Sequence, residues 1–217
     1  VAALGALIGV GLGPGDPELV TVKAARLIGA AKVVAFFAKR GRASHARAIA
    51  AHYLSPGCEE IALLYPVTTE IPFDQPEYVQ SLQQFYEDCV MRIRAVLEAG
   101  RDVTLLCEGD PLLYGSFMHM FARLDSRFRI EICAGVSGMS RCFAAARQPM
   151  AWGDDVLTVL PATLDEDSLA SRLSATDAAV VMKLGGNFAK LRRAMKRAGG
   201  ADRAIYVERG TMAGEKI

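Results

Sequence analysis

Short apolar runs alternate with longer stretches of helical periodicity through the first part of the chain. The runs are rich in β-branched and aromatic residues and predict five strands, at Leu4–Val10, Lys32–Phe37, Glu59–Leu64, Val103–Cys107 and Phe128–Cys133. The stretches between them predict helices at Thr21–Ala30, Ser44–Leu54, Glu77–Ala99 and Ser116–Leu124. Strands that alternate with helices need crossover connections, so this pattern predicts a mostly parallel sheet with helices on both faces.

A second, shorter series follows a segment of small residues, 135–152, that has no strand pattern. It predicts strands and helices at Val156–Leu160, Ser168–Leu173, Ala178–Leu184, Asn187–Ala198 and Ala204–Glu208. We therefore expect an α/β protein of two α/β domains: an N-terminal domain (1–134), an interdomain helix or linker (135–152) and a C-terminal domain (153–217) with a smaller mixed sheet. The chain stops soon after Gly210, so we expect the second domain to lack its last strands.

Composition narrows the class of protein. With 217 residues, 52% hydrophobic and 23% charged, the chain can bury a core. Its 25 basic and 24 acidic residues give a net charge of +1, which argues against nucleic-acid binding by bulk charge. No apolar run reaches the roughly 18 residues of a membrane span. Five cysteines without a C-x-x-C pair and three separated histidines predict reduced thiols and no metal site, as in a cytoplasmic enzyme.

In open parallel sheets, ligands bind beyond the carboxyl ends of the strands, so the residues after each strand are the candidates for function. The first loop, Gly9–Pro17, is rich in glycine, which lets a ligand approach the backbone. It is a poor phosphate cradle, because Pro14 stands where the dinucleotide fingerprint needs a glycine and no Gly-Lys-Ser/Thr follows. The first loop therefore predicts a ligand site, or else a tight connection capped by Asp16.

The second loop, Glu108–Ser116, repeats the Gly-Asp-Pro sequence of the first. Both loops follow predicted strands of one sheet, so we expect their acidic tips to lie side by side at its edge. In the alternative interpretation, Asp110 is a helix N-cap with Pro111 at the first helical position. Weaker candidates follow the remaining strands, at Ala134–Gly138 (the third loop), Leu160–Thr163, Met182–Gly185 and Glu208–Thr211. Their positions indicate a ligand cleft between the two domains.

A basic cluster follows the second strand and comprises Lys39, Arg40, Arg42 and, one turn into the next helix, Arg47. Convergent arginine and lysine side chains suit the recognition of carboxylates or phosphates. A solvated basic loop is the alternative. A NAD site would need a carboxylate for the ribose at this place, and the sequence has none.

The ordered loops resemble those of the tetrapyrrole (corrin/porphyrin) methylases over nearly the whole chain. The first loop, continued by Glu18-Leu19 and by Thr21 and Lys23, is similar to the family's proline-containing loop. The segment Gly109-Asp110-Pro111 with Tyr114-Gly115 is similar to its second loop. Gly135-Val136-Ser137 is similar to its Pro-Gly-Val-Ser segment, with Ala134 in place of the proline, which loses a fixed φ at this turn.

Within the family, Ala38–Ile49 and Glu108–Phe117 look like the precorrin-2 C20-methyltransferases of cobalamin (vitamin B12) synthesis. This resemblance implies two α/β domains, S-adenosyl-methionine as the methyl donor with S-adenosyl-homocysteine as its product, a tetrapyrrole substrate and a homodimer. Carried over by motif, the donor-binding residues would be Pro14, Gly109, Asp110, Pro111, Tyr114, Ser137, Gly138, Pro161, Ala162, Leu184, Gly210 and Thr211.

The expected chemistry is methyl transfer to an electron-rich carbon of the reduced tetrapyrrole, which needs orientation more than an enzymic nucleophile. A proton must then leave, and Asp16, Glu108, Asp110 and Tyr114 are the candidates to accept it. Lys39, Arg40, Arg42 and Arg47 would pair with acetate and propionate groups of the substrate. The alternatives are C20 methylation of a cobalt-bound substrate, methylation at another position, a silent tetrapyrrole-binding module, and an NADPH-dependent reductase with Lys39 and Arg40 on the 2′-phosphate.

Overall fold

The computed structural model describes residues 3–66, 75–210 and 212–217. It divides into two compact units, Val1–Gly138 (unit 1) and Met139–Ile217 (unit 2). The division falls inside the segment 135–152, which the sequence predicts as interdomain helix or linker. Each unit is described by itself.

Unit 1 is built on five parallel strands in the order β3-β2-β4-β1-β5. The strands are β1 (Leu7–Gly11), β2 (Val33–Lys39), β3 (Glu59–Tyr65), β4 (Val103–Cys107) and β5 (Ile130–Cys133). Its helices are α1 (Val22–Ala30), α2 (His45–Ala50), α3 (Pro76–Glu98) and α4 (Phe117–Leu124), with a 3-10 turn η1 (Pro17–Leu19). The predicted parallel sheet is confirmed, and its five strands are the five predicted from the apolar runs.

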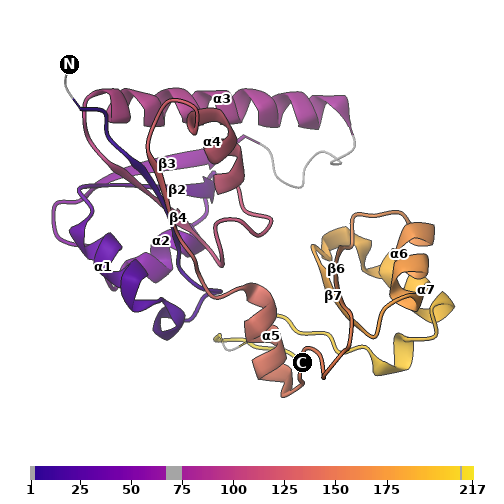
Figure 1. Cartoon of the computed structure of the whole chain (residues 1–217). Helices are drawn as coiled ribbons and strands as arrows, with labels where there is room; N and C mark the ends of the chain where they lie inside the picture. The colour runs from indigo at the N-terminus through magenta and orange to yellow at the C-terminus, as the bar shows by residue number, and fades with distance from the viewer. Residues whose placement is uncertain (1–2, 67–74, 211) are drawn as a thin grey trace. The chain divides into compact units, whose positions relative to one another are not determined.

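Helices cover both faces of this sheet (Figure 1). Side chains alternate along each strand, so Val33 and Ala35 face α3 and α4, while Val34 and Phe36 face α1 and α2. Each face has its own buried cluster, and β4 is buried along its whole length. A strand buried on both faces has a continuous apolar sequence, which is why the short apolar runs located these strands.

Thr21 and Ser44, the first residues of two predicted helices, cap those helices in the structure. The Thr21 hydroxyl accepts a hydrogen bond from the Ala24 N–H at 3.1 Å, at the start of α1. The Ser44 hydroxyl accepts from the Arg47 N–H at 3.3 Å and donates to the Phe37 carbonyl at 2.8 Å. Ser44 is buried. Through these two hydrogen bonds it caps α2 and connects the start of that helix to the carboxyl end of β2.

Unit 2 contains a two-stranded parallel sheet of β6 (Leu157–Pro161) and β7 (Ala178–Met182). Its other elements are α5 (Gly138–Ala146), which begins at the last residue of unit 1, α6 (Glu166–Ser174), η2 (Gly185–Asn187), α7 (Phe188–Arg197) and η3 (Ala201–Arg203). Leu160, Leu169 and Leu191 form its buried core with Ala170 and Ala194. The unit therefore has a small core of one strand pair and two helices.

The predicted strand Ala204–Glu208 is wrong. Ala204, Ile205 and Tyr206 are exposed and belong to no named strand, and only Glu208 forms an isolated antiparallel bridge, with Lys216. The segment has the β-branched and aromatic composition of a strand, but it covers no core. Strand propensity reflects packing on a half-buried sheet, and the described residues offer this segment no such surface.

Candidate active site

The first and second loops are joined by backbone hydrogen bonds at the carboxyl ends of β1 and β4. The Gly109 N–H donates to the Gly13 carbonyl at 2.7 Å, and the Leu12 N–H donates to the Cys107 carbonyl at 2.9 Å. Gly13 and Gly109 form an isolated antiparallel bridge, both with left-handed φ angles of 72° and 71°. The two Gly-Asp-Pro loops thus meet at one sheet edge, as predicted, whereas the expectation that their acidic side chains lie side by side stays a prediction.

The Asp110 carboxylate connects the second loop to the third. Its Oδ1 accepts from the Leu112 N–H at 2.9 Å and its Oδ2 accepts from the Gly135 N–H at 3.0 Å. The residues after Pro111 form turns, and α4 begins only at Phe117. Asp110 is therefore not the N-cap of a helix. Its negative charge holds two loops together through two backbone donors.

The third loop packs so closely against the other two that only glycine fits. A Cβ atom on Gly135 would lie 2.2 Å from the Gly109 oxygen and 2.8 Å from the Gly11 Cα. A Cβ on Gly11 would in turn lie 2.5 Å from the Gly135 nitrogen. Three loops from β1, β4 and β5 thus form one rigid backbone assembly, which we call the joined loops.

In the first loop, Asp16 caps a 3-10 turn and Pro14 is buried. The Asp16 Oδ1 accepts from the Glu18 N–H at 2.9 Å and caps η1, as the alternative interpretation of this loop expects. Pro14 is buried, and the Tyr53 hydroxyl donates to the Pro17 carbonyl at 2.8 Å. The loop is fixed at both ends of its proline-rich segment, which suits a preformed ligand site.

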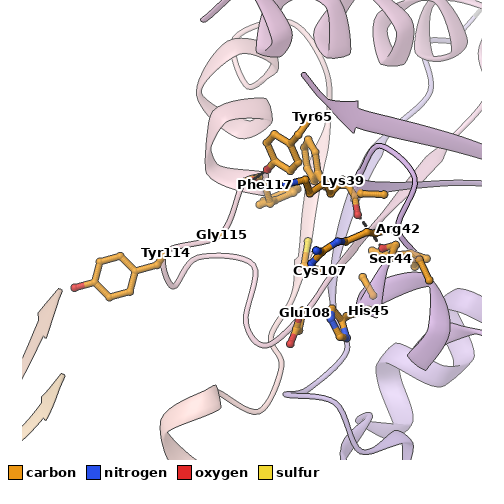
Figure 2. Close-up of a pocket in the computed structure, with 16 residues that line it drawn as sticks. Lys39, Arg42, Ser44, His45, Tyr65, Cys107, Glu108, Tyr114, Gly115 and Phe117 are labelled. Atoms are coloured by element: carbon orange, nitrogen blue, oxygen red, sulfur yellow. Dashed lines mark hydrogen bonds between the residues drawn. The ribbon is translucent and has the colours of Figure 1, made fainter. Parts of the chain in front are cut away.

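A pocket of about 440 Å³ opens in unit 1 beside the second loop (Figure 2). It lies where β2, β3 and β4 end and where α2 and α4 begin. Its lining residues are Phe37, Ala38, Lys39, Arg42, Ala43, Ser44, His45, Ala46, Tyr65, Leu106, Cys107, Glu108, Tyr114, Gly115, Ser116 and Phe117.

Two of the four predicted substrate-binding residues, Lys39 and Arg42, line this pocket. Arg40 is exposed and is not among the lining residues. Arg47 instead pairs with Glu60 of β3 through two hydrogen bonds, from Nε to Oε2 at 2.6 Å and from the second guanidinium nitrogen to Oε1 at 2.7 Å. These hydrogen bonds raise the pKa of Arg47 and lower that of Glu60. The guanidinium of Arg47 is thus engaged in a bidentate ion pair.

Glu108 and Tyr114 both line the pocket but differ in position. Glu108 lies beside His45 at one end of the pocket, and the Tyr114 ring points away from the other labelled side chains (Figure 2). Tyr114 is 40% exposed, and its φ of 53° is left-handed. A bulky residue in that region is strained by about 1–3 kcal/mol, and such strain is concentrated at functional sites.

The thiol at this pocket is not a nucleophile. Burial raises the pKa of Cys107 to about 12, so the sulfur stays protonated near neutral pH. All five cysteines are free thiols. Among the described residues, no group of histidine, cysteine and carboxylate side chains could hold a metal ion.

Ser137 and Gly138 are the last residues of the third loop, and Gly138 is also the first residue of α5. A Cβ atom on Gly138 would meet nothing within 4 Å. The two residues thus continue the joined loops directly into a helix N-terminus.

The candidate residues of unit 2 also follow its strands. Pro161 ends β6, and the Ala162 N–H donates to the Met182 carbonyl of β7 at 2.7 Å. Leu184 precedes η2, and its carbonyl accepts from the Asn187 N–H at 2.7 Å. Gly210 is buried, whereas Thr211 lies outside the described residues. The predicted cleft between the domains stays a prediction.

Sequence reasoning missed Tyr65 and His45 as pocket residues. Tyr65 is the last residue of β3 and pairs in register with Lys39. The rule that drew attention to the other strand ends applies equally to this one. His45 follows the helix cap Ser44 directly, and nothing in the local pattern distinguishes it from a solvated helix residue.

The amino-acid sequence is similar to that of known proteins along nearly its whole length. The family model described as Tetrapyrrole (Corrin/Porphyrin) Methylases matches residues 6–217. A precorrin-2 C(20)-methyltransferase from a Sinorhizobium species is 51% identical over 209 residues, which are 96% of this chain and 85% of that protein. The cobalamin biosynthesis protein CobIJ of Mycobacterium bovis is 50% identical over 217 residues, all of this chain but only 43% of that protein.

A solved structure supports the same fold. The uroporphyrin-III C-methyl transferase from Thermus thermophilus, complexed with S-adenosyl-homocysteine, matches with a TM-score of 0.65 at 22% identity, over 98% of this chain and 86% of that one. No helix among the described residues is long and apolar enough to cross a membrane. With the joined loops in place and a family model matched along nearly its whole length, the chain belongs to the tetrapyrrole (corrin/porphyrin) methylases.

Proposed function

We propose that this protein is an S-adenosyl-methionine-dependent methyltransferase that methylates precorrin-2 at C20, giving precorrin-3A in cobalamin biosynthesis. The observation that carries the proposal is the 51% identity to a precorrin-2 C(20)-methyltransferase over 96% of the chain. Membership of the methylase family removes the reason to consider an NADPH-dependent reductase. The cytoplasmic location and the homodimer stay predictions.

The joined loops leave space for the methyl donor against their backbone. Their glycines bring the backbone close together, and a Cβ on Gly109 would project into open space, so the glycine leaves room for a ligand against the loop. The residues proposed to hold the donor are Pro14, Gly109, Asp110, Pro111, Tyr114, Ser137 and Gly138 of unit 1, and Pro161, Ala162, Leu184, Gly210 and Thr211 of unit 2. When bound, S-adenosyl-methionine supplies a methyl group already activated for displacement.

The chain's own residues then have to orient the substrate and accept a proton. Rigid backbone loops can hold a reactant in a productive geometry, an effect that contributes on the order of 7–11 kcal/mol in well-oriented reactions. Of the four candidate bases, Asp110 has both carboxylate oxygens occupied by backbone N–H groups, and Asp16 caps η1. Glu108 lines the pocket, is exposed, and has no hydrogen bond to other described residues. The Tyr114 ring points away from the other labelled pocket side chains (Figure 2). Glu108 is therefore the proposed proton acceptor.

The test of the function is direct. The protein is incubated with precorrin-2 and S-adenosyl-methionine that carries a ¹³C-methyl group, and NMR locates the new methyl. We expect the label at C20. A parallel reaction with the cobalt-bound substrate shows whether the protein acts on the metal-free or on the cobalt-bound tetrapyrrole. Label at another carbon, or none incorporated with either substrate, contradicts the proposal.

Arg42→Ala is expected to raise the KM for precorrin-2 by about tenfold or more, because a charge-assisted hydrogen bond to a substrate carboxylate is lost. Lys39 and Arg42 are the two basic cluster residues that line the pocket. Arg40→Ala is the matched comparison, since it removes the same charge from an exposed residue outside the lining. Steady-state kinetics should show a much smaller change for Arg40→Ala. Equal KM values for the two variants would show that the pocket does not select a carboxylate through Arg42.

A further inference from the structure

Three hydroxyl groups converge behind the pocket, and we call Tyr65, Tyr86 and Ser116 the hydroxyl cluster. The Tyr86 hydroxyl donates to the Ser116 Oγ at 3.3 Å. The Tyr65 hydroxyl and the Ser116 Oγ form a second, short hydrogen bond in which either oxygen can be the donor. Tyr65 and Ser116 line the pocket, whereas Tyr86 does not.

Counting protons shows that this cluster can present one donor to the pocket. Three hydroxyls carry three protons, and the two hydrogen bonds among them use two. If Tyr65 donates to Ser116, the remaining proton belongs to Ser116; if Ser116 donates to Tyr65, it belongs to Tyr65. Burial raises the pKa of Tyr65, so its phenol keeps its proton. The Tyr65 hydroxyl also interacts with the Tyr86 hydroxyl, which can accept its proton in the second arrangement. In the first arrangement, the remaining donor is the Ser116 hydroxyl, and Ser116 lines the pocket.

Packing of Tyr86 fixes the cluster in place. Its ring stacks on His119, with centroids 3.9 Å apart and planes 15° apart, and it contacts Phe85 at 5.3 Å and Phe37 at 6.3 Å. The Arg123 guanidinium lies 5.8 Å from the same ring and pairs with Glu87 at 2.8 Å. A donor held by such packing loses little entropy when it binds a ligand.

The other polar groups of the pocket indicate what the donor meets. Lys39 and Arg42 bring positive charge to the lining. The Ser44 hydroxyl also lines the pocket, but its proton is used on the Phe37 carbonyl. The Glu108 carboxylate lines the pocket too and offsets one of these two positive charges. Two cations and a hydroxyl donor against one carboxylate still suit a ligand group with negative charge.

We propose that the hydroxyl cluster binds one acetate or propionate carboxylate of the tetrapyrrole, donating its remaining proton to that group beside Lys39 and Arg42. This assignment rests on the proposed function for the identity of the substrate. It makes Tyr65 and Ser116 binding residues that help to select the orientation of the macrocycle. Tyr86 is not a binding residue, because its hydroxyl proton is used on Ser116 and it does not line the pocket.

The test compares variants that lack different hydroxyl groups of the cluster. Tyr65→Phe with Ser116→Ala removes both possible donors at the pocket, and we expect the KM for precorrin-2 to rise by about tenfold to a hundredfold while the Kd for S-adenosyl-homocysteine changes little. Tyr86→Phe also removes a hydroxyl, but Tyr65 and Ser116 still have one proton to spare, so we expect less than about a threefold change. Tyr206→Phe with Ser174→Ala removes the same two groups from exposed sites of unit 2 and controls for the double substitution.

A second readout does not depend on turnover. Uroporphyrin III, a stable tetrapyrrole polycarboxylate, is titrated into wild-type protein and each variant, with folding checked by circular dichroism. The double variant should bind it at least about tenfold more weakly, and Tyr86→Phe should bind it nearly as well as wild type. Equal Kd values for wild type and the double variant, or no binding to the wild-type protein, overturn the assignment. C20 methylation by wild type alongside an unchanged KM in the double variant would refute the assignment and leave the proposed function standing. Weaker porphyrin binding by the double variant, with no methylation by wild type, would support the carboxylate site and contradict the proposed function.

Discussion

Replacement of Asp110 by asparagine is expected to weaken binding of S-adenosyl-homocysteine by more than about tenfold. The carboxylate accepts the N–H groups of Leu112 and Gly135 on its two oxygens. An amide of the same size has one oxygen, so its NH₂ group would face one of those backbone donors. Hydrogen bonds to charged groups contribute about 1.5–3 kcal/mol each, and their loss would release the third loop from the second. Isothermal titration calorimetry measures the change in Kd.

Asp16→Asn is the matched control, because the two aspartates occupy equivalent positions in the two Gly-Asp-Pro loops. The Asp16 carboxylate accepts one N–H, that of Glu18, within its own loop. An asparagine oxygen can replace that acceptor, so the Kd should change by less than about threefold. Wild-type affinity in Asp110→Asn, or equal losses in both variants, would show that the connection between the loops does not govern donor binding.

Replacement of Gly135 by alanine is expected to lower the free energy of unfolding of unit 1 by about 3 kcal/mol or more. The added Cβ would lie 2.2 Å from the Gly109 oxygen and 2.8 Å from the Gly11 Cα. Both obstructing atoms belong to backbone, so no side-chain rotation relieves the clash. The chain's one tryptophan, Trp152, lies in unit 2 and does not report on this event. Hydrogen exchange at the amides of β1 and β4 measures it directly.

Gly138→Ala supplies the control for that experiment. Gly138 is the first residue of α5, its φ is not left-handed, and a Cβ there would meet nothing within 4 Å. Alanine is also the better helix former by up to about 1 kcal/mol, so the stability should stay the same or rise slightly. A Gly135→Ala protein that exchanged its β1 and β4 amides as slowly as the Gly138→Ala protein would contradict the close packing of the three loops.

The sequence was sufficient to predict that the joined loops meet, because the carboxyl ends of parallel strands share one edge. It was not sufficient to predict how closely they pack. The contact between Gly11 and Gly135 depends on β1 lying next to both β4 and β5, and local patterns do not determine strand order. The ion pair of Arg47 with Glu60 likewise depends on β3 lying beside β2. Local pattern identified the strands, whereas partners across the sheet required the topology.

The hydroxyl cluster illustrates the same limit. Tyr65 stands at a strand end and was accessible to the rule that found the loops. Tyr86 lies within α3, where helical spacing predicts a buried face but not what that face contacts. At Ala204–Glu208, by contrast, the sequence predicted a strand that the structure does not have, because this strand-like segment has no core to cover. Composition predicts burial only where the fold supplies a surface to pack against.

The interior position of β1, between β4 and β5, has a consequence for how the protein is made. Its neighbours in the sheet are β4 and β5, and Leu7 is in register with Val103 on one side and with Ile130 on the other. During synthesis, this apolar segment leaves the ribosome long before either neighbour exists, and it must wait as an unsatisfied edge while β2 and β3 are already able to pair. A nascent chain halted before Val103 would expose that segment to chaperones and to aggregation.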